Sequence, residues 1–450
     1  MFILKYHRQI FITLCVYIGQ MLGGYLLSWT APVIPKLEDP NQSPLSRTLT
    51  DVEKSLLASV IYVTGFPGVF FTSWLANYKG RKPTLIMGSF VLLISFLILA
   101  VATNFTTLLI GRLVTGFGIS FGGVITTVYL GEIASTNIRG ITLTGLGIIQ
   151  TFGSLIMVSV GPFVSYAVIC YIGVAISAVY VIAMFLIPES PVYHVVKDNE
   201  KKVLAVLKIL NRESALQEVI DLNKNKVVAI AREDWKELFT LKCNRRGLFI
   251  TGTIMALHYI SGILVISFFV TTIFQAAGSS IEPSIASIII GCTQLVGSSL
   301  APIFIERSGR RMLLMTSTAI CCLSMTFFGV YFYLSYIESP IVEKIKWLPL
   351  TLLIIFFLSN NMGFGTIPST LSGEVFSCNV RSKGTAVVFA ISWACGFAVT
   401  TLFNSMLTLG AHFVLWFFAF TCCLAFLFTV FFVPETKGKS LVEIQDMLSK

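Results

Sequence analysis

Charged residues are scarce in this chain of 450 amino acids, and their scarcity excludes a soluble protein. Asp, Glu, Lys and Arg together make up 12% of the sequence, whereas a soluble domain carries about 25%. Hydrophobic residues make up 55%, and the mean hydropathy is +0.84. The apolar residues form repeated runs of about 20, the length at which a helix crosses a bilayer. The composition therefore indicates a protein that spans a membrane many times.

Histidine is also scarce, and the residues that enzymes need are not grouped. The four histidines are His7, His194, His258 and His412, and no two share a predicted helix at metal-ligand spacing. Gly438-Lys439-Ser440 resembles the end of a phosphate-binding loop, but Val433 occupies the place of the required earlier glycine. We therefore expect no enzymatic activity, no metal site and no cofactor.

The basic residues lie mainly on one side of the predicted spans. The net charge is +10, but most Lys and Arg fall in loops that alternate with apolar runs in the pattern of the positive-inside rule. This distribution places both termini in the cytoplasm and argues for lipid, not nucleic acid, as the neighbour of the basic surface. The ten cysteines lie in apolar runs or cytoplasmic loops, so we expect free thiols.

Twelve apolar runs are expected to form spans. They cover about 9–30, 54–77, 83–103, 106–130, 141–163, 165–187, 247–273, 282–305, 312–335, 347–371, 382–406 and 411–433. The predicted fold is an all-α membrane protein with twelve transmembrane helices in two six-helix bundles. We expect a first bundle over 1–187, a cytoplasmic linker with short helices over 188–246, a second bundle over 247–433 and a short cytoplasmic tail over 434–450.

Three short motifs occur twice, in the same order and at similar places in the two halves. Glu132 precedes Arg139 by seven residues, and Glu374 precedes Arg381 by the same number. The other repeated pairs are Gly80-Arg81-Lys82 with Gly309-Arg310-Arg311 and Pro188-Glu189-Ser190 with Pro434-Glu435-Thr436. The chain thus appears as one half-molecule used twice, which is typical of transporters.

Five uncharged polar residues are predicted to lie near the membrane midplane. Counting 1.5 Å per residue from the helix ends places there Gln150, His258, Gln294, Asn361 and Ser392. Amides, a hydroxyl and an imidazole suit a neutral, polyhydroxylated ligand at the depth where transporters bind substrate. The alternative is that each residue only bonds a neighbouring helix.

Seven charged residues are predicted at the cytoplasmic helix ends. They are Arg81, Glu132, Arg139, Glu306, Arg310, Glu374 and Arg381. Solvated loops often carry charges, but the paired placement favours ion pairs that close the inner face and break when it opens. We therefore predict a cytoplasmic gate formed by these residues.

These motifs resemble the sugar-porter branch of the major facilitator superfamily over nearly the whole chain. The resemblance is carried by Gly80-Arg81-Lys82, Gly111-Arg112, Glu132 with Arg139-Gly140, Pro188-Glu189-Ser190-Pro191, Glu306 to Arg311, Gly363-Phe364-Gly365 with Pro368, Glu374 with Arg381, and Pro434 to Gly438. In detail it is most similar to insect facilitated trehalose transporters and facilitative glucose transporters. It implies alternating access and passive movement of a hexose or disaccharide across a plasma membrane.

The chain departs from the family pattern in the pocket. The family carries Gln-Gln-x-Ser-Gly-x-Asn in span seven, where this chain has His258-Tyr259-Ile260-Ser261-Gly262-Ile263-Leu264. Ser369 replaces an expected tryptophan, and Asn77 replaces an aspartate. The resemblance thus adds Tyr259 and Ser369 to the candidate substrate site and implies an altered substrate range.

The leading hypothesis is a facilitative sugar carrier with a small neutral sugar as its partner. Span one contains no Asp or Glu, and an intramembrane carboxylate is the usual proton carrier, so we expect uniport. A sugar sensor on the same scaffold is one alternative, although sensors usually carry longer cytoplasmic tails; a carrier of another neutral solute is the other.

Asn41-Gln42-Ser43 is a glycosylation sequon, whose use Pro44 disfavours.

Overall fold

The computed structural model describes residues 2–197, 199–212, 216, 231–278, 281–376, 380–437 and 441–449. Within these ranges, twelve helical segments are long and apolar enough to cross a membrane. They are Tyr6–Glu38, Asp51–Tyr78, Arg81–Ala100, Phe105–Ile133, Ile138–Phe163, Tyr166–Leu186, Lys242–Phe268, Pro283–Ser308, Arg310–Tyr336, Leu348–Val375, Lys383–Phe403 and Ala411–Phe432. The predicted fold class is confirmed.

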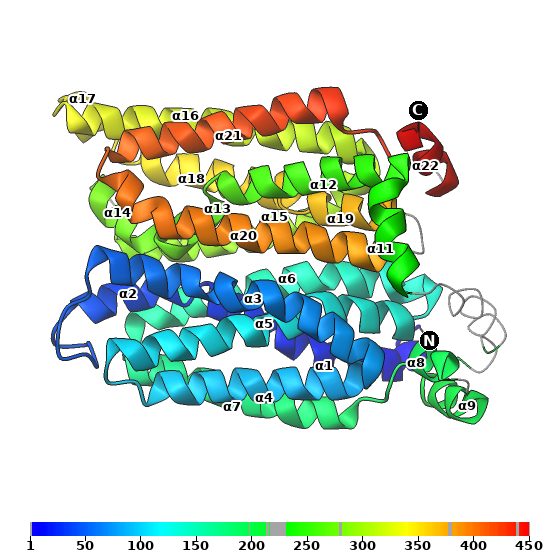
Figure 1. Ribbon diagram of the computed structural model, residues 1–450. Helices are drawn as coiled ribbons and strands as arrows, with labels where there is room; N and C mark the ends of the chain where they lie inside the picture. The colour runs from blue at the N-terminus through cyan, green and yellow to red at the C-terminus, as the bar shows by residue number, and fades with distance from the viewer. Residues whose placement is uncertain are drawn as a thin grey trace.

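The first half of the chain forms helices α1 to α7, which lie together in Figure 1. Their bounds are α1 (Phe2–Leu27), α2 (Thr30–Glu38), α3 (Asp51–Tyr78), α4 (Arg81–Ala100), α5 (Phe105–Ile133), α6 (Thr136–Val160) and α7 (Tyr166–Leu186). A short 3-10 turn, Gly161–Phe163, follows α6. A capping box begins α3, because the Thr50 side chain accepts from the Glu53 backbone N–H and the Glu53 carboxylate accepts from the Thr50 backbone N–H.

The second half forms the helices from α12 to α21. Their bounds are α12 (Lys242–Ile260), α13 (Ile263–Phe268), α14 (Val270–Ala277), α15 (Pro283–Ser308), α16 (Arg310–Tyr336), α17 (Ile341–Lys344), α18 (Leu348–Ser359), a π-helix (Asn360–Phe364), α19 (Ile367–Val375), α20 (Arg381–Leu407) and α21 (Ala411–Phe432). Both halves run lengthwise beside each other in Figure 1.

Short helices gather at the end of the molecule that carries both termini (Figure 1), which we call the terminal end. They are α8 (Pro191–Val196), α9 (Glu200–Ile209), α11 (Ala231–Thr240) and α22 (Leu441–Ser449). The Ser190 side chain caps α8 by accepting from the Val192 N–H. The opposite end, with α2, α14 and α17, is the distal end. The Gly438-Lys439-Ser440 sequence lies outside the described residues.

Three of the twelve spans are not continuous α-helices. Span one divides between α1 and α2, just before Pro32, and span seven divides between α12 and α13 at Gly262, whose φ is +89°. Span ten changes from α-helix to π-helix at Asn360 before α19 begins. Proline lacks an N–H and glycine tolerates a left-handed backbone, which explains the first two breaks.

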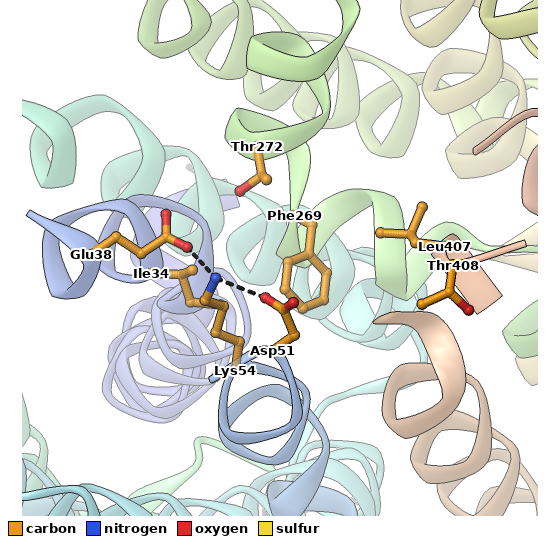
Figure 2. Close-up of a pocket in the computed structure, with 8 residues that line it drawn as sticks. All are labelled: Ile34, Glu38, Asp51, Lys54, Phe269, Thr272, Leu407 and Thr408. Carbon is orange, nitrogen blue, oxygen red and sulfur yellow. Dashed lines mark hydrogen bonds and ion pairs between the residues drawn. The ribbon is translucent and has the colours of Figure 1, made fainter. Parts of the chain in front are cut away.

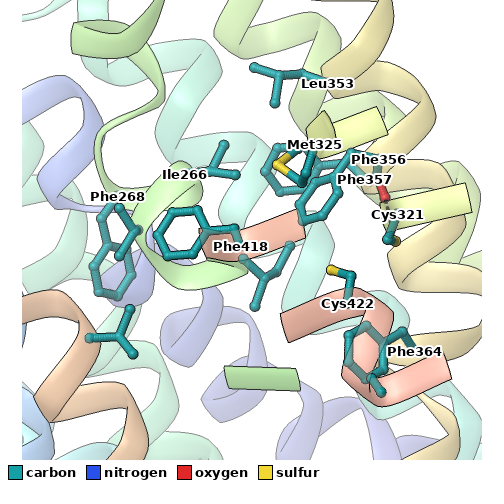
Figure 3. Close-up of a cluster of buried hydrophobic side chains, with 14 of the residues drawn as sticks. Ile266, Phe268, Cys321, Met325, Leu353, Phe356, Phe357, Phe364, Phe418 and Cys422 are labelled. Carbon is teal, nitrogen blue, oxygen red and sulfur yellow. Dashed lines mark hydrogen bonds between the residues drawn. The ribbon is translucent and has the colours of Figure 1, made fainter. Parts of the chain in front are cut away.

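Buried apolar side chains form one large cluster in each half. The first draws on residues between Ile12 and Leu210, and the second on residues mostly between Ile250 and Leu448. Figure 3 shows the middle of the second cluster, where Phe356 and Phe357 lie with Met325 and Phe418. Nine cysteines are free thiols, including Cys321 and Cys422 of this cluster; Cys378 lies outside the described residues.

Helices α1 and α6 approach so closely that only glycine fits between them. An added methyl group at Gly24 would lie 1.8 Å from the carbonyl oxygen of Gln150, and one at Gly153 would lie 1.9 Å from that of Met21. Small residues allow this backbone contact, which favours association of helices in a membrane. The two helices therefore form one rigid pair in the first half.

Gly24→Ala is expected to lower the yield of folded protein, because its methyl group collides with the α6 backbone and overpacking costs about 1–3 kcal/mol. Gly23→Ala is the matched control. The nearest atom there is the Gln20 Oε1 at 3.8 Å, and alanine favours a helix over glycine by about 1 kcal/mol. Size-exclusion profiles of both variants measure the folded fraction. Equal yields would contradict the close α1–α6 contact.

Candidate functional site

His258 lies at the break in span seven, close to the π-helix of span ten. Its Nε2 is 3.3 Å from the Oδ1 of Asn360, the first residue of the π-helix. The helix α12 ends just beyond it, where the Ser261 hydroxyl donates to the His258 carbonyl at 2.6 Å. The rings of Phe364 and Tyr259 stand edge-on to the imidazole, with centroids at 5.1 and 5.5 Å.

The π-helix directs two successive asparagines to different neighbours. Asn360 faces His258 on α12, whereas the Asn361 Oδ1 accepts from Ser298 on α15 at 3.3 Å. The Asn361 Nδ2 donates to the Phe357 carbonyl at 2.9 Å. Single-turn π-helices are frequent at functional sites, because the wider turn changes which way side chains point. The turn thus connects α12 and α15 through adjacent amides.

Two polar atoms of this group have no hydrogen-bond partner. The Nδ1 of His258 and the Nδ2 of Asn360 are buried and unpaired. Because most buried polar groups are paired, an unpaired amide donor and an unpaired ring nitrogen on two contacting side chains need an explanation. A ligand hydroxyl could both accept from an amide and donate to an imidazole.

The remaining predicted substrate residues are dispersed around this group. Tyr259 lies close to Ser392 on α20, whose hydroxyl donates to the Phe389 carbonyl at 2.6 Å. Gln294 is half-buried on α15, one turn before Ser298, and Gln150 is half-buried on α6 in the other half. Ser369 is exposed, and its hydroxyl donates to the Thr366 carbonyl. The structure therefore groups His258, Asn361, Tyr259 and Ser392 most closely.

Two further polar residues, Asn360 and Ser298, belong to this region, and a third, Gln20, lies on α1 of the other half; all three were absent from the sequence prediction. Asn360 and Ser298 make the contacts described above. Gln20 is half-buried on α1, and its Oε1 is the atom nearest an added methyl at Gly122 of α5, at 3.7 Å. Depth counting could have found Gln20, which follows Arg8 by twelve residues. No sequence signal tells Asn360 from Asn361.

Apolar contacts join the two halves toward the distal end. Tyr62 of α3 stacks on Phe268 with centroids 6.4 Å apart and meets Trp393 of α20 edge-on at 5.5 Å. Gly65 leaves room for the Trp393 ring, because a methyl group there would lie 1.8 Å from it. At the terminal end, by contrast, a methyl group at Gly131 of α5 or Gly373 of α19 would meet no atom within 4 Å.

The charged motifs of the first half form one network at the terminal end. The Arg81 guanidinium donates to both Glu132 oxygens, at 3.1 and 2.9 Å. The Ser190 hydroxyl also donates to Glu132. Glu189 accepts from the backbone N–H groups of Arg81 and Lys82 at 2.9 and 3.2 Å. Since these two N–H groups begin α4, the Glu189 carboxylate caps that helix.

The second half repeats this network with the equivalent residues. Arg310 binds Glu374 at 2.8 Å, and the Thr436 hydroxyl donates to the other Glu374 oxygen at 2.6 Å. Glu435 accepts from the backbone N–H groups of Arg310 and Arg311, both at 3.1 Å. The three repeated sequence motifs are therefore the three parts of one structural unit.

Burial and hydrogen bonding act in opposite directions on the pKa values of the two capping carboxyls, Glu189 and Glu435, and a different effect prevails in each. Burial raises the pKa of Glu189, although the N–H groups of Ser190, Lys82 and Arg81 oppose it. Burial also acts to raise the pKa of Glu435. Hydrogen bonds from backbone N–H groups, the strongest from Lys437, outweigh burial there, so the Glu435 pKa is lowered. Hydrogen bonds to a carboxylate favour its charged form.

The predicted gate residues do not all join these networks. Arg139 donates to the Ala134 carbonyl at 3.4 Å instead of pairing with Glu132, and its Nε is unpaired. Glu306 is exposed, and the Arg381 side chain lies outside the described part of the chain. Both ion pairs join helices of the same half. Arg212, which the sequence did not single out, donates to the Ile133 carbonyl at 2.9 Å at the end of α5.

A fully buried arginine lies nearer the distal end. Arg112 of α5 donates to the carbonyls of Leu57 and Leu26, both at 3.1 Å, and its guanidinium lies 4.9 Å from the centre of the Trp29 ring. Its described partners are carbonyls and an aromatic face, which stabilise a cation without neutralising it.

A family model for sugar (and other) transporters matches residues 12–448. The chain belongs to this family. A family of transporters agrees with the expectation that the protein is not an enzyme. The facilitated trehalose transporters Tret1 of Aedes aegypti and Culex quinquefasciatus are each 30% identical over 447 residues, or 97% of this chain. The chain covers 54% of the Aedes protein and 85% of the Culex protein, so it spans little more than half the length of the first.

Solved structures show the fold of this transporter family. The inward open conformation of the xylose transporter XylE from E. coli matches with a TM-score of 0.79 at 19% identity, covering 98% of this chain and 99% of that one. A D-xylose-proton symporter matches with a TM-score of 0.74 at 20% identity, covering 97% and 100%. At these identities the likeness establishes the major facilitator architecture.

The Arg310–Glu374 ion pair is expected to contribute measurably to stability. Its side chains are 20% and 24% exposed. The coupling free energy between them should therefore fall between ~1 kcal/mol, as for exposed pairs, and ~3 kcal/mol, as for buried pairs. A double-mutant cycle with Arg310→Leu and Glu374→Leu measures it by thermal unfolding. The control is Lys346–Glu343, also at 2.8 Å but 37% and 74% exposed, where about 0.5 kcal/mol or less is expected. Equal coupling free energies for the two pairs would show that Arg310–Glu374 stabilises the protein no more than an exposed pair does.

Proposed function

We propose that this protein is a facilitative sugar transporter of the plasma membrane, which moves a hexose or trehalose by alternating access. The observation that carries the proposal is the polar group at the breaks of spans seven and ten, where buried atoms of His258 and Asn360 lack partners. This group is uncharged, so it suits a neutral ligand with hydroxyl groups. Membership of the sugar (and other) transporter family and the names of its trehalose-transporting relatives support the substrate class.

The proposed orientation places the terminal end in the cytoplasm. The contacts of Tyr62 with Phe268 and Trp393 hold the halves together toward the distal end, while Gly131 and Gly373 border unfilled space. In the proposed scheme this arrangement is the state open toward the cytoplasm. In this scheme each ion-pair network holds the helices of its own half together, and the halves rotate as units. Asn41 lies exposed at the distal end, where glycosylation would take place.

Uptake of radiolabelled sugars tests the proposal directly. Oocytes that express the protein are expected to accumulate trehalose or a hexose to equilibrium, with saturable kinetics, above the level of uninjected cells. Surface labelling measures how much transporter reaches the membrane. Surface-expressed protein that takes up neither class would refute the proposed substrate.

A carrier of another neutral solute is the second candidate. His258, Tyr259 and Ser369 stand where the sugar-porter pattern has two glutamines and a tryptophan, and these changes alter the lining of the pocket. Uptake of small neutral polyols in the same oocytes distinguishes the two, because this candidate predicts polyol uptake without sugar uptake.

His258→Leu is expected to raise the half-saturation concentration of the transported sugar without loss of surface expression. Leucine removes both ring nitrogens, whereas His258→Gln keeps a donor and an acceptor and is expected to retain or broaden sugar transport. His412→Leu, which changes a histidine buried among rings near the distal end, is the control. Uptake kinetics per surface-labelled molecule give the comparison. An unchanged half-saturation in His258→Leu would remove this residue from the site.

Transport is expected to be independent of a proton gradient. Arg112 bonds the backbone carbonyl of Leu26, and α1 has no carboxylate that could carry a proton, while Glu38 at the distal end of span one is paired with Lys54. In proteoliposomes, an imposed pH gradient should leave both the initial rate and the final sugar distribution unchanged. Uphill accumulation that a proton ionophore abolishes would show that uniport is wrong.

A further inference from the structure

A cavity lies between the two halves at the distal end, away from His258. Figure 2 shows residues of α2 and α3 on one side of it and residues of α14 and of the end of α20 on the other. Its volume is about 310 Å³, at the lower end of the range of about 300–1,000 Å³ for small-molecule sites. A molecule of mono- or disaccharide size would therefore contact both halves.

The charged residues of the cavity are one ammonium and two carboxylates, so Lys54 neutralises one of the two negative charges. The Lys54 ammonium binds Glu38 and also Asp51, the latter at 3.0 Å. Figure 2 shows it between the two carboxylates. A cation would have to compete with this ammonium, and an anion would meet two carboxylates. The Lys54 ammonium thus already occupies the place between the carboxylates that a cation would take, and a neutral ligand meets neither obstacle.

The rest of the lining offers hydroxyl groups and an apolar floor. Thr272 is exposed on α14, and the Thr408 hydroxyl donates to the Ser405 carbonyl at 2.7 Å, which leaves its oxygen free to accept. Carboxylates accept up to about four hydrogen bonds and an ammonium donates three, so the ion pairs keep spare capacity. The ring of Phe269 presents an apolar face to the same space. Spare donors and acceptors beside an aromatic face suit a sugar, which has hydroxyl edges and apolar C–H faces.

We propose that this cavity is a second sugar site, separate from the central one and located at the end that the proposed orientation places outside the cell. The ligand class rests on the proposed function. Because the occupant contacts both halves, it binds best when they are close together at this end. A ligand that prefers one conformation shifts the population toward it. The site therefore couples external sugar to closure of the outer face.

Protection of an introduced cysteine tests the site without requiring transport. Leu407 lines the cavity, and Leu407→Cys leaves the polar groups intact. Trehalose or glucose is expected to slow its modification by a small methanethiosulfonate reagent, followed at that peptide by mass spectrometry of the purified full-length protein. At a sugar concentration ten times the dissociation constant, mass action predicts slowing of about tenfold. Lys54→Met or Thr272→Val, added singly, should weaken the protection.

Two controls decide whether the protection reports this cavity. Leu409→Cys lies two residues away, is 72% exposed and does not line the cavity, so its modification rate should not change. His258→Leu in the Leu407→Cys protein should leave the protection in place. No slowing with either sugar, equal slowing at Leu409→Cys, or loss of protection with His258→Leu would each overturn the second site. Protection in a protein that takes up no sugar would refute the proposed transport and leave the site standing.

Discussion

The backbone of a membrane-spanning segment must satisfy its own hydrogen bonds, because the surrounding lipid offers none. Unbroken helices meet this requirement, and a break is tolerated only where neighbouring protein groups replace the lost bonds. In this chain the breaks occur at Ser28–Trp29, at Ser261–Gly262 and at Asn360–Phe364. At the second break the Ser261 hydroxyl bonds the His258 carbonyl, and at the third the π-helix supplies wider hydrogen-bonded turns. Breaks of this kind bring polar side chains together inside an apolar protein.

The sequence predicts the spans and the paired motifs because both depend on local pattern. Twenty apolar residues span a bilayer whatever they pack against, and the caps at Thr50 and Ser190 use residues within a few positions. The repeated motifs pointed correctly to a structural unit present twice. The partners inside that unit were less predictable, because Glu132 binds Arg81, which is 51 residues away, and Arg139 turns to a backbone carbonyl. Spacing along the chain does not determine which of several nearby cations reaches a carboxylate.

The polar group around His258 shows the same limit of sequence-based prediction for individual side chains. Depth counting placed His258 and Asn361 at one level, since rise per residue is constant. Depth counting could not indicate which of the two asparagines contacts the imidazole. The π-helix directs Asn360 there, because it has one extra residue in a helical turn. Ser369 was added by the family pattern alone; its side chain is exposed and bonds the Thr366 carbonyl, and its place in the pocket stays a prediction. Which side chains bind substrate stays a prediction that the His258 variants test.

The buried guanidinium of Arg112 has a consequence for the energetics of the whole molecule. It is a full positive charge inside the low-dielectric region, and its described partners are dipoles and a ring. A membrane potential acts on such a charge, with about 2.3 kcal/mol for a complete crossing at 100 mV. If the first half rotates during a cycle, any movement of Arg112 along the membrane normal is electrical work. The rates of a carrier that moves an uncharged solute would then depend on voltage, even when no net current accompanies the solute.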